Sequence, residues 1–509
     1  MKVALLPLGA VSAATLHVNT TKIAAGGAVN VSWSGVDLKL IKPLHLHFYD
    51  DDSHVSHWRL EGGQSLWLGQ FSPPVMSKND IRMSGSPLNR AEAHNISTEG
   101  TPPFTAPAPN KFISGAQLSR GFHPFIVSNM RAEVNWVLCA GDMVNSSSFE
   151  VLAISPSVSL TDAASPMHLR LARTSSLDEM RVSWTSAQAS GTHEVQWGTS
   201  PSALSSTTAA KTHTYAASDL CSYPANDTGF HQPGHFHEAV LSLPCDRPTG
   251  MQLHYRVGSQ EYGWSSVRSF TAPTPAKAGH GVGAPALSVV VTADMGETYE
   301  DGSQYHWEEP AAVNTTVHIA RLLKVNGGVG LDLVMHPGDL AYATGYESEW
   351  DRFMAQIEPL SAHVPYMTAM GNHERDFPNS GAAIGKGDSG GECGVPTQAR
   401  FHMPTCPQPN VAPCIGQMAG AHSGLSLAPG SAKRRLAGPV GSADDGWYSF
   451  NQGPVHFAVM TTEHASTRGS RQHAFFEADL AAVDRKVTPW VLFLGHRQMY
   501  SGNSMRCVV

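Results

Sequence analysis

The segment LDLVMHPGDLAY, residues 331–342, begins as a short apolar run and ends in a turn that carries Asp339 and Tyr342. An apolar run of this length, without polar alternation, is typical of a strand buried on both faces of a parallel sheet. ALSVVVTAD (286–294) has the same character, and AAVNTTVHIARLLKV (311–325), which lies between the two runs, has apolar residues at helical spacing. This order predicts a β-α-β unit.

Three more strand-like runs follow: VPYMTAMGN (364–372), PVHFAVMTT (454–462) and PWVLFLGH (489–496). Four of the five runs end on a side chain that can bind a metal ion, namely Asp294, Asp339, Asn372 and His496. Functional groups in α/β sheets gather at the carboxyl ends of the strands. We therefore predict an α/β domain over residues 286–509 with its functional site at that edge.

The residue types at these strand ends suit a pair of metal ions. They lie in the motifs DMG (294–296), GDLAY (338–342), GNHE (371–374) and GHR (495–497). Carboxylate, amide and imidazole donors together can hold two cations that activate a phosphate ester. The phenol of Tyr342, with an ordinary pKa near 10, would need a strongly charged ion to be ionised at mildly acidic pH, which indicates a trivalent metal such as Fe(III).

Two β-rich regions precede this domain. Residues 15–158 contain alternating segments such as VNVSWSGV (29–36) and predict an N-terminal β-rich domain. Residues 159–272 contain six strand-like segments separated by turn residues, as expected for a fibronectin III-like β-sandwich. A Pro-, Gly- and Ala-rich stretch over 273–285 reads as a linker, and the Gly-, Ala- and Ser-rich stretch 415–446 as a disordered surface loop.

Composition excludes several classes of function. The 509 residues are 41% hydrophobic and 15% charged, which is typical of a globular multidomain chain. The net charge of -8 gives no basic field for nucleic acid, and no stretch approaches the roughly 18 apolar residues of a membrane span. We therefore expect neither nucleic acid nor a membrane as a partner.

Compartment signals point outside the cytosol. Residues 1–14 combine one lysine, a short apolar stretch and small residues, and we expect a signal peptide there. N-glycosylation motifs and cysteines able to form disulfides favour a secreted or vacuolar glycoprotein. The six motifs begin at Asn19, Asn30, Asn95, Asn145, Asn226 and Asn314, and there are seven cysteines.

The ordered motifs resemble those of the large plant and algal purple acid phosphatases, which are calcineurin-like metallophosphoesterases. SGGECGVP (389–396), TEH (462–464) and GFHQPGHFHEAVL (229–241) strengthen the resemblance, which covers most of the chain. It implies an acid phosphatase that hydrolyses small phosphate monoesters and can form a homodimer. It further implies Asp294 and Tyr342 on the Fe(III) side, Asp339 as a bridge, and Asn372 with His496 on a divalent Zn, Mn or Fe(II) ion. His373 would then assist the phosphate.

One feature of the family has no counterpart here. Purple acid phosphatases carry a later GHxH motif with one histidine for each metal, and nothing after His496 matches it. We expect that the phosphoesterase domain is truncated at its C-terminus and that this chain is inactive or weakly active. Two other HxH patterns, at His235 and His237 and at His45 and His47, are interpreted as strand residues of the β domains.

Two alternative functions remain open at the level of the sequence. A nucleotide pyrophosphatase or phosphodiesterase would use the same metal ions. A non-catalytic secreted binding protein is the alternative from another class, because the two β domains accompany an incomplete set of metal ligands.

Overall fold

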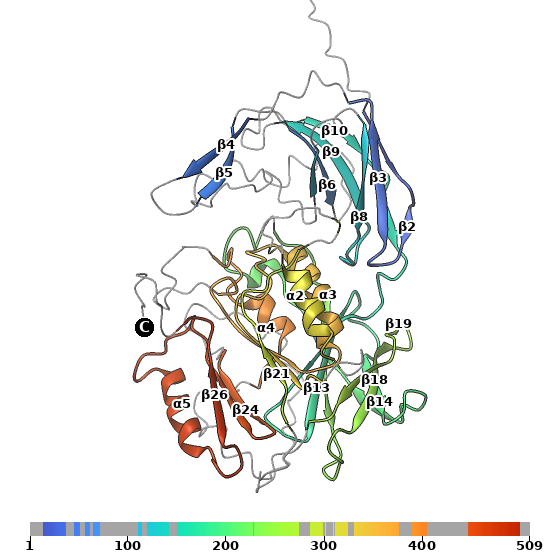
Figure 1. Ribbon diagram of the computed structural model, residues 1–509. Coiled ribbons are helices and arrows are strands. Elements are labelled where there is room, and N and C mark those ends of the chain that lie inside the picture. Colours follow the sequence, from blue (N-terminus) through green and yellow to red (C-terminus); the bar gives the residue numbers. More distant parts are fainter. Residues whose placement is uncertain are drawn as a thin grey trace, which may run out of the picture. The chain divides into compact units, whose positions relative to one another are not determined.

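Alternating and apolar segments of the chain form the strands that the sequence predicts, and Figure 1 shows the computed structural model that contains them. The structure describes residues 14–36, 45–50, 56–61, 65–71, 110–113, 120–141, 150–227, 229–273, 286–298, 301, 309, 311–323, 330–375, 388–404 and 446–498. The chain divides into two compact units, residues 1–163 with 299–307 and residues 164–298 with 308–509. The expected signal peptide, apart from Ala14, the linker, apart from Pro273, and the loop at 415–446, apart from Gly446, lie outside the described residues.

The first unit is built from strands, as its alternating sequence predicts. One sheet has the order β1-β3-β8, a second has the order β10-β9-β6-β7, and two further pairs are β11-β2 and β4-β5. A core of buried apolar side chains, which includes Trp33 and Trp136, fills this unit. The strands are β1 (Thr15–Val18), β2 (Lys22–Ile23), β3 (Ala28–Ser34), β4 (His45–Asp50), β5 (Ser56–Glu61), β6 (Ser65–Phe71), β7 (Asn110–Ile113), β8 (Gly121–Ile126), β9 (Asn135–Gly141), β10 (Glu150–Ile154) and β11 (Ser159–Leu160).

The second unit begins with a β-sandwich, which confirms the fibronectin III-like prediction. One sheet has the order β12-β13-β17-β16, and the other has β15-β14-β18-β19 with β20 also paired to β18. Their facing side chains form one core around Trp184 and Tyr255. The elements are β12 (Met167–Ala172), β13 (Glu179–Ser186), β14 (Glu194–Gly198), β15 (Ser206–Ala209), β16 (Lys211–His213), η6 (Ala217–Asp219), β17 (His235–Ser242), β18 (Gln252–Ser259), β19 (Gly263–Trp264) and β20 (Arg268–Thr271).

Two three-stranded sheets and four described helices form the rest of this unit. In the first sheet β21, β22 and β23 are all parallel; in the second β24 is antiparallel to β25, and β26 is parallel to β25. Apolar side chains of both sheets, among them Met335 and Phe457, share one core, so the sheets pack face to face. The elements are β21 (Val289–Val291), α2 (Ala312–Ala320), β22 (Leu333–Pro337), α3 (Glu347–Ser361), β23 (Tyr366–Ala369), α4 (Val395–Arg400), β24 (Tyr448–Gln452), β25 (Val455–Val459), α5 (Arg471–Ala482) and β26 (Trp490–Leu494).

The sandwich packs against helix α3, so the two parts of the second unit are continuous. Ser361 donates a hydrogen bond to the Leu169 carbonyl at 2.7 Å, and the Tyr255 hydroxyl donates to the Ala362 carbonyl at 2.8 Å. The disulfide between Cys221 and Cys393 joins the sandwich to the segment before α4. The geometry of the two three-stranded sheets and their helices therefore depends on the module that precedes them.

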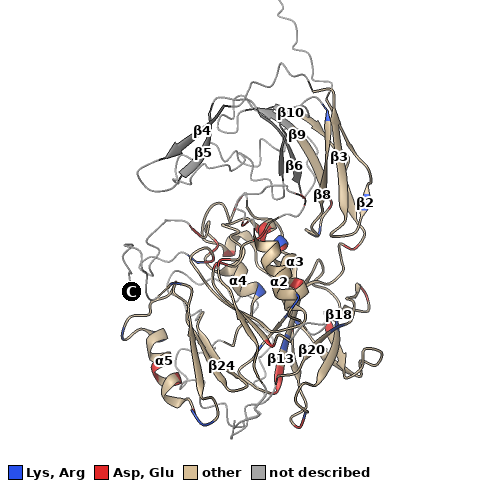
Figure 2. Ribbon diagram, viewed as in Figure 1, with Lys and Arg blue, Asp and Glu red and all other residues tan. Residues whose placement is uncertain are grey.

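Two further features of the described elements are the placement of their charged residues and the length of their helices. Figure 2 shows Lys and Arg scattered among Asp and Glu on the described elements, without a basic stripe there. Among the helices that the structure describes, none has the length and apolar character needed to cross a membrane.

Buried histidines of the sandwich predict a loss of stability in acid. His237 is fully buried, and burial lowers its pKa to about 3; burial and the nearby His402 lower the pKa of His213 to about 4. The unfolded chain takes up these protons near pH 6.5, whereas the folded chain does not, so stability falls as pH drops from about 6.5 toward 4. Each group contributes at most about 1.4 kcal/mol per pH unit.

The melting temperature measured at several values between pH 7.5 and 5 should therefore decline, and His237→Phe should make the decline shallower. His237→Phe removes the buried imidazole but retains an aromatic ring beside Trp184, with which His237 stacks at 5.2 Å. Equal slopes in the two proteins would contradict this assignment. Lys211→Gln, an exposed change on the neighbouring strand β16, serves as the control with an unchanged slope.

Candidate metal centre

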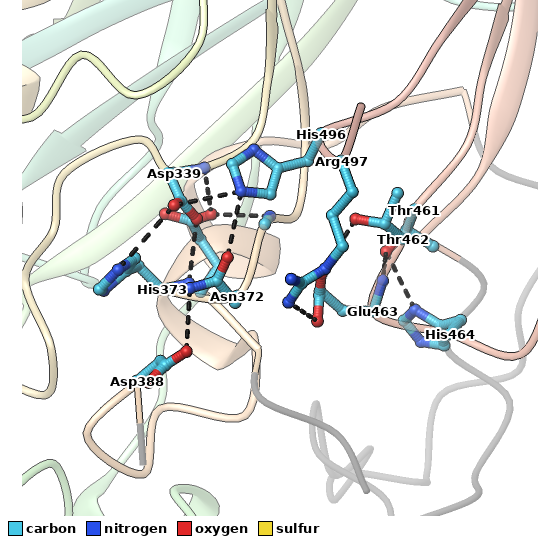
Figure 3. Close-up of polar contacts among 12 residues, drawn as sticks. Asp339, Asn372, His373, Asp388, Thr461, Thr462, Glu463, His464, His496 and Arg497 are labelled. Atoms are coloured by element: carbon cyan, nitrogen blue, oxygen red, sulfur yellow. Dashed lines mark hydrogen bonds and ion pairs between the residues drawn. The ribbon is translucent and has the colours of Figure 1, made fainter. Parts of the chain in front are cut away.

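The predicted ligands follow directly after strands whose carboxyl ends meet. Asp294 comes three residues after β21, Asp339 two residues after β22, and Asn372 three residues after β23. Because these strands are parallel neighbours, their carboxyl ends lie at one edge of the sheet. His496 reaches the same place from the end of β26 in the second sheet. Figure 3 shows the ring of His496 beside Asp339 and Asn372.

Two glycines allow the loops to approach this closely. A Cβ atom at Gly338, where φ is +111°, would lie 2.7 Å from the Cβ of His496. A Cβ atom at Gly371 would lie 2.2 Å from the Asp339 carboxylate. Such distances are too short for any side chain, so the GD and GN pairs of the motifs are required for backbone packing at the site.

Three predicted ligands adopt a left-handed backbone. Asp294, Asp339 and Tyr342 have φ values of 55°, 51° and 54°, and they are three of the seven non-glycine residues with positive φ in the described part of the chain. This conformation costs on the order of 1–3 kcal/mol per residue and is concentrated at functional sites. Helix α3 begins only at Glu347, and the left-handed turns before it aim the side chains of Asp339 and Tyr342.

Three donor atoms converge at the centre of the site. One ligand atom from each of Asp294, Asp339 and His496 lies within 4.8 Å of the others. His496 Nε2 is 3.1 Å from the Asp339 carboxylate and 3.1 Å from the Asn372 side-chain oxygen. The Tyr342 hydroxyl donates to Asp294 at 2.9 Å. The five predicted ligands thus form one connected group.

The charges in this group respond strongly to one another. Burial would raise the pKa of Asp339, but the hydrogen bond and charge of His496 outweigh it and lower the pKa. Burial would lower the pKa of His496, but the interaction with Asp339 raises it. Burial and the charge of Asp339 raise the pKa of the Tyr342 phenol well above its ordinary range. A concentration of negative charge here favours a cation.

This donor set fits a metal centre. Carboxylate, phenol, amide oxygen and imidazole groups are the hard and borderline donors that Fe(III), Zn²⁺ and Mn²⁺ accept. The donor atoms already face one another, and the backbone is fixed by close glycine contacts, so little rearrangement is needed to hold an ion. These five residues would hold the metal, and Asp339 is the carboxylate that lies close to both Asp294 and His496.

His373 lies beside the same carboxylate. Its backbone N–H donates to Asp339 at 3.0 Å, and its Nε2 atom lies 3.9 Å from the other oxygen of that carboxylate. Its ring contacts the Tyr342 ring at a centroid distance of 4.3 Å. This position suits a group that contacts a substrate held at the metal centre.

Glu374 fastens two of the loops, a role that the sequence did not suggest. Its fully buried carboxylate accepts backbone hydrogen bonds from Asp339, Leu340 and Gly371 at 2.7 to 2.9 Å. Burial and the charge of Asp339 raise the pKa of Glu374 to about 8. The glutamate of GNHE therefore fixes the ends of β22 and β23 to each other. The only sequence signal for this role was that Glu374 belongs to the GNHE motif.

Two further motifs meet next to His496. Arg497 of GHR donates to Glu463 of TEH through Nε at 2.9 Å and through a terminal nitrogen at 3.3 Å. Glu463 is fully buried, so the pair anchors the loop after β25 to the loop after β26 (Figure 3). Both motifs can be recognised in the sequence, but the sequence does not indicate that they contact each other.

The structure also agrees with the interpretation of GHFH as a strand. His235 and His237 lie in β17, and the two ring nitrogens of His237 pair with the hydroxyls of Thr212 and Ser186 at 2.8 Å. His45 and His47 lie in β4, of which only the backbone is described.

Comparisons with known proteins match both parts of the second unit. Residues 166–272 match the family model of the purple acid phosphatase N-terminal domain, and residues 287–507 match that of the calcineurin-like phosphoesterases. The solved structure of purple acid phosphatase PPD1 from yellow lupin (Lupinus luteus) seeds is similar with a TM-score of 0.68 and 27% identity, over 96% of this chain and 73% of that one.

Relatives in sequence carry related names. The chain is 33% identical to "Probable inactive purple acid phosphatase 27" of Arabidopsis thaliana, over 86% of this chain and 63% of the relative. It is 36% identical to "Nucleotide pyrophosphatase/phosphodiesterase" of Hordeum vulgare, over 47% of this chain and 54% of the relative. The chain thus spans less than two thirds of the length of either relative. The matching domains, the relatives and the fold together support a metallophosphoesterase of the purple acid phosphatase type.

Proposed function

We propose that the chain forms the catalytic part of an acid phosphatase that hydrolyses small phosphate monoesters at a dinuclear centre of Fe(III) and Zn, Mn or Fe(II). The observation that carries this proposal is the convergence of Asp294, Asp339 and His496 within 4.8 Å, together with Tyr342 and Asn372. Bound metal ions would polarise the phosphate group and lower the pKa of water. The side chains supply the remaining functions.

Asp339 would be shared by the two ions, and its position close to both His496 and Asp294 supports this role. Asn372 adds an oxygen without adding charge. His373 can exchange a proton with a phosphoryl or leaving-group oxygen, because its Nε2 atom is directed to the centre, 3.9 Å from Asp339. Glu374 keeps the two loops fixed while this happens.

Hydrolysis of nucleotide pyrophosphates or other diesters is the second candidate, favoured by the similarity to the barley protein. A non-catalytic binding protein is the third, favoured by the word "inactive" in the name of the Arabidopsis relative. The full chain, loaded with Fe(III) and Zn²⁺, should be tested side by side with p-nitrophenyl phosphate, bis(p-nitrophenyl) phosphate and ATP.

Fastest turnover of the monoester supports the proposal, whereas faster turnover of the diester or of ATP favours the second candidate. The metal content of the same sample distinguishes the third candidate, a non-catalytic binding protein, from the two enzymes. About two metal equivalents per chain with turnover exclude a purely binding role, and a chain without metal and without turnover favours it.

Replacing Tyr342 by Phe should remove the visible colour of the Fe(III)-loaded protein, because the phenolate is the proposed source of the charge-transfer band. The visible absorption spectrum measures this directly. Tyr346→Phe is a matched control, since Tyr346 is a buried tyrosine four residues further along the chain and is not one of the proposed ligands. A Tyr342→Phe protein that keeps the colour would refute the ligand assignment.

We also propose secretion or vacuolar targeting with N-glycosylation, and a homodimer as the assembly. The disulfide between Cys221 and Cys393 supports an oxidising compartment, because such bonds are rare in the cytosol. Asn226 of one glycosylation motif lies only five residues after Cys221. Analysis of the mobility of the protein before and after glycosidase treatment tests the glycosylation.

A further inference from the structure

The side-chain amide of Asn372 is held at both ends. Its oxygen lies 3.1 Å from His496 Nε2, on the side of the converging ligands, and its nitrogen donates a hydrogen bond to Asp388 at 3.0 Å. Figure 3 shows Asp388 on the opposite side of the amide from His496. The contact with Asp388 therefore determines which end of the amide faces the centre.

We propose that Asp388 is a positioning residue that fixes the amide of Asn372 so that its oxygen, and not its NH₂ group, faces the metal ion. The proposal rests on the proposed function, because it assumes that a metal ion binds at this centre. The segment SGGECGVP (389–396), which carries part of the family resemblance, begins directly after Asp388, so the resemblance assigns Asp388 no role.

The physical reason is the near symmetry of an amide. Its oxygen and its NH₂ group have almost the same size, so packing alone distinguishes the two orientations poorly. An ionised carboxylate only accepts hydrogen bonds, so Asp388 can pair with the NH₂ group and not with the oxygen. Groups that orient a metal ligand in this way typically change metal affinity by about 10- to 100-fold when they are removed.

Asp388 is itself placed by a well-fastened segment. The carbonyl of Gly390 accepts from Ala225 at 3.1 Å, and that of Gly391 accepts from Cys221 at 2.9 Å. The disulfide from Cys221 to Cys393 closes the same segment. The loop of the β-sandwich that carries Cys221 therefore supports the residue that orients Asn372.

The other side of this segment is fastened to the phosphoesterase part. Buried Glu392 accepts from the Gly345 backbone at 2.8 Å and from the indole of Trp350 in α3 at 3.0 Å. A Cβ atom at Gly390 would lie 1.7 Å from the Thr344 carbonyl, so the two backbones are in direct contact. Asp388 thus directly precedes a segment that is held on both sides, by the sandwich and by the loop before α3.

The experiment compares Asp388→Ala and Asp388→Asn with the wild-type full chain, using Zn²⁺ or Mn²⁺ alone as the probe. Affinity is measured by calorimetry and by the rise of the melting temperature with metal concentration. We expect Asp388→Ala to weaken metal binding about 10- to 100-fold and Asp388→Asn to weaken it less, because an amide can accept in one of its orientations. The melting temperature without metal should change little.

A double-mutant cycle separates positioning from general support. In an Asn372→Ala background, Asp388→Ala should cause no further loss of metal affinity, because the group that it orients is gone. Asp332→Ala is the matched control: Asp332 also accepts a hydrogen bond at 2.8 Å, from the Ser288 backbone, but at the opposite end of strand β22.

The outcomes distinguish the two proposals. Wild-type chain that binds neither metal would overturn the metal centre and, with it, the role of Asp388. Wild-type chain that binds metal while Asp388→Ala binds it equally well would overturn only the positioning role. Additive losses in the double-mutant cycle would also overturn it, since they would mean that Asp388 acts independently of Asn372.

Discussion

Replacing Asp339 by Asn should weaken metal binding by at least about 100-fold and abolish any phosphatase activity, because losing even a group outside the metal ligands costs about 10- to 100-fold. Asn is nearly isosteric and can still accept the hydrogen bond from the His373 backbone. The change therefore removes the charge that faces His496 at 3.1 Å while preserving the shape of the site. Calorimetric titration with Zn²⁺ or Mn²⁺ measures the loss.

Asp479→Asn provides a closely matched control for this experiment. Asp479 is also a buried aspartate paired with a histidine, His456, at 2.9 Å, but it lies in α5 and is not part of the converging group. Asp479→Asn should leave metal affinity unchanged even if it lowers the melting temperature. An Asp339→Asn protein with wild-type metal affinity would refute the central position given to this carboxylate.

Replacing Glu347 by Ala should lower the free energy of unfolding of the second unit by about 3–5 kcal/mol, the usual cost of leaving a buried charge without its partner. Glu347 forms an ion pair with Arg400, whose side chain is 1% exposed, and accepts a hydrogen bond from Tyr215 of the sandwich. Burial would lower the pKa of Arg400, but the charge of Glu347 outweighs it, so the guanidinium stays charged.

Urea unfolding followed by tryptophan fluorescence measures the effect, since Trp350 packs 5.1 Å from the guanidinium of Arg400. Glu477→Ala is the surface control: its pair with His473 is largely exposed, and the change should stay within about 0.5 kcal/mol. The double change Glu347→Leu with Arg400→Met should destabilise less than Glu347→Ala, because it leaves no buried charge. A cost below about 1 kcal/mol for Glu347→Ala would contradict this account.

The strands of the phosphoesterase part could be predicted because their apolar runs are short and bounded by motif residues. All five predicted runs contain a strand, and the helix predicted at 311–325 appears as Ala312–Ala320. The pairing into two packed sheets could not be predicted, because a run buried on both faces does not state which strands lie beside it. Strand β24 was missed because its sequence, YSFNQ, is not an apolar run like the other five.

Helix α3 was not predicted, and polar residues on most of its sides are buried. Trp350 and Phe353 are buried together with charged residues such as Glu349 and Asp351, since the helix is covered on several sides, including by β12. Trp350, Phe353 and Ile357 nevertheless recur at the spacing of an amphipathic helix, so the sequence does carry the usual helical signal.

The sequence predicted the proposed metal ligands better than the residues that hold those ligands and their loops in place. Asp294 and His496 could be found because each ends an apolar run in a recognisable motif. Asp388 and Glu463 could not be given roles, because their partners, Asn372 and Arg497, are distant in the sequence. Left-handed backbone at Asp339 and Tyr342 has no sequence signal either, since glycine is the residue expected in that conformation.

The left-handed backbone at Asp294, Asp339 and Tyr342 determines which substitutions these positions would favour if no ligand had to be held there. Glycine adopts such a conformation without strain, so a backbone of this kind favours glycine wherever the side chain has no function. Two neighbouring loops, one with Asp294 and one with Asp339 and Tyr342, instead hold carboxylate and phenol groups in this strained backbone, as expected where those groups bind an ion.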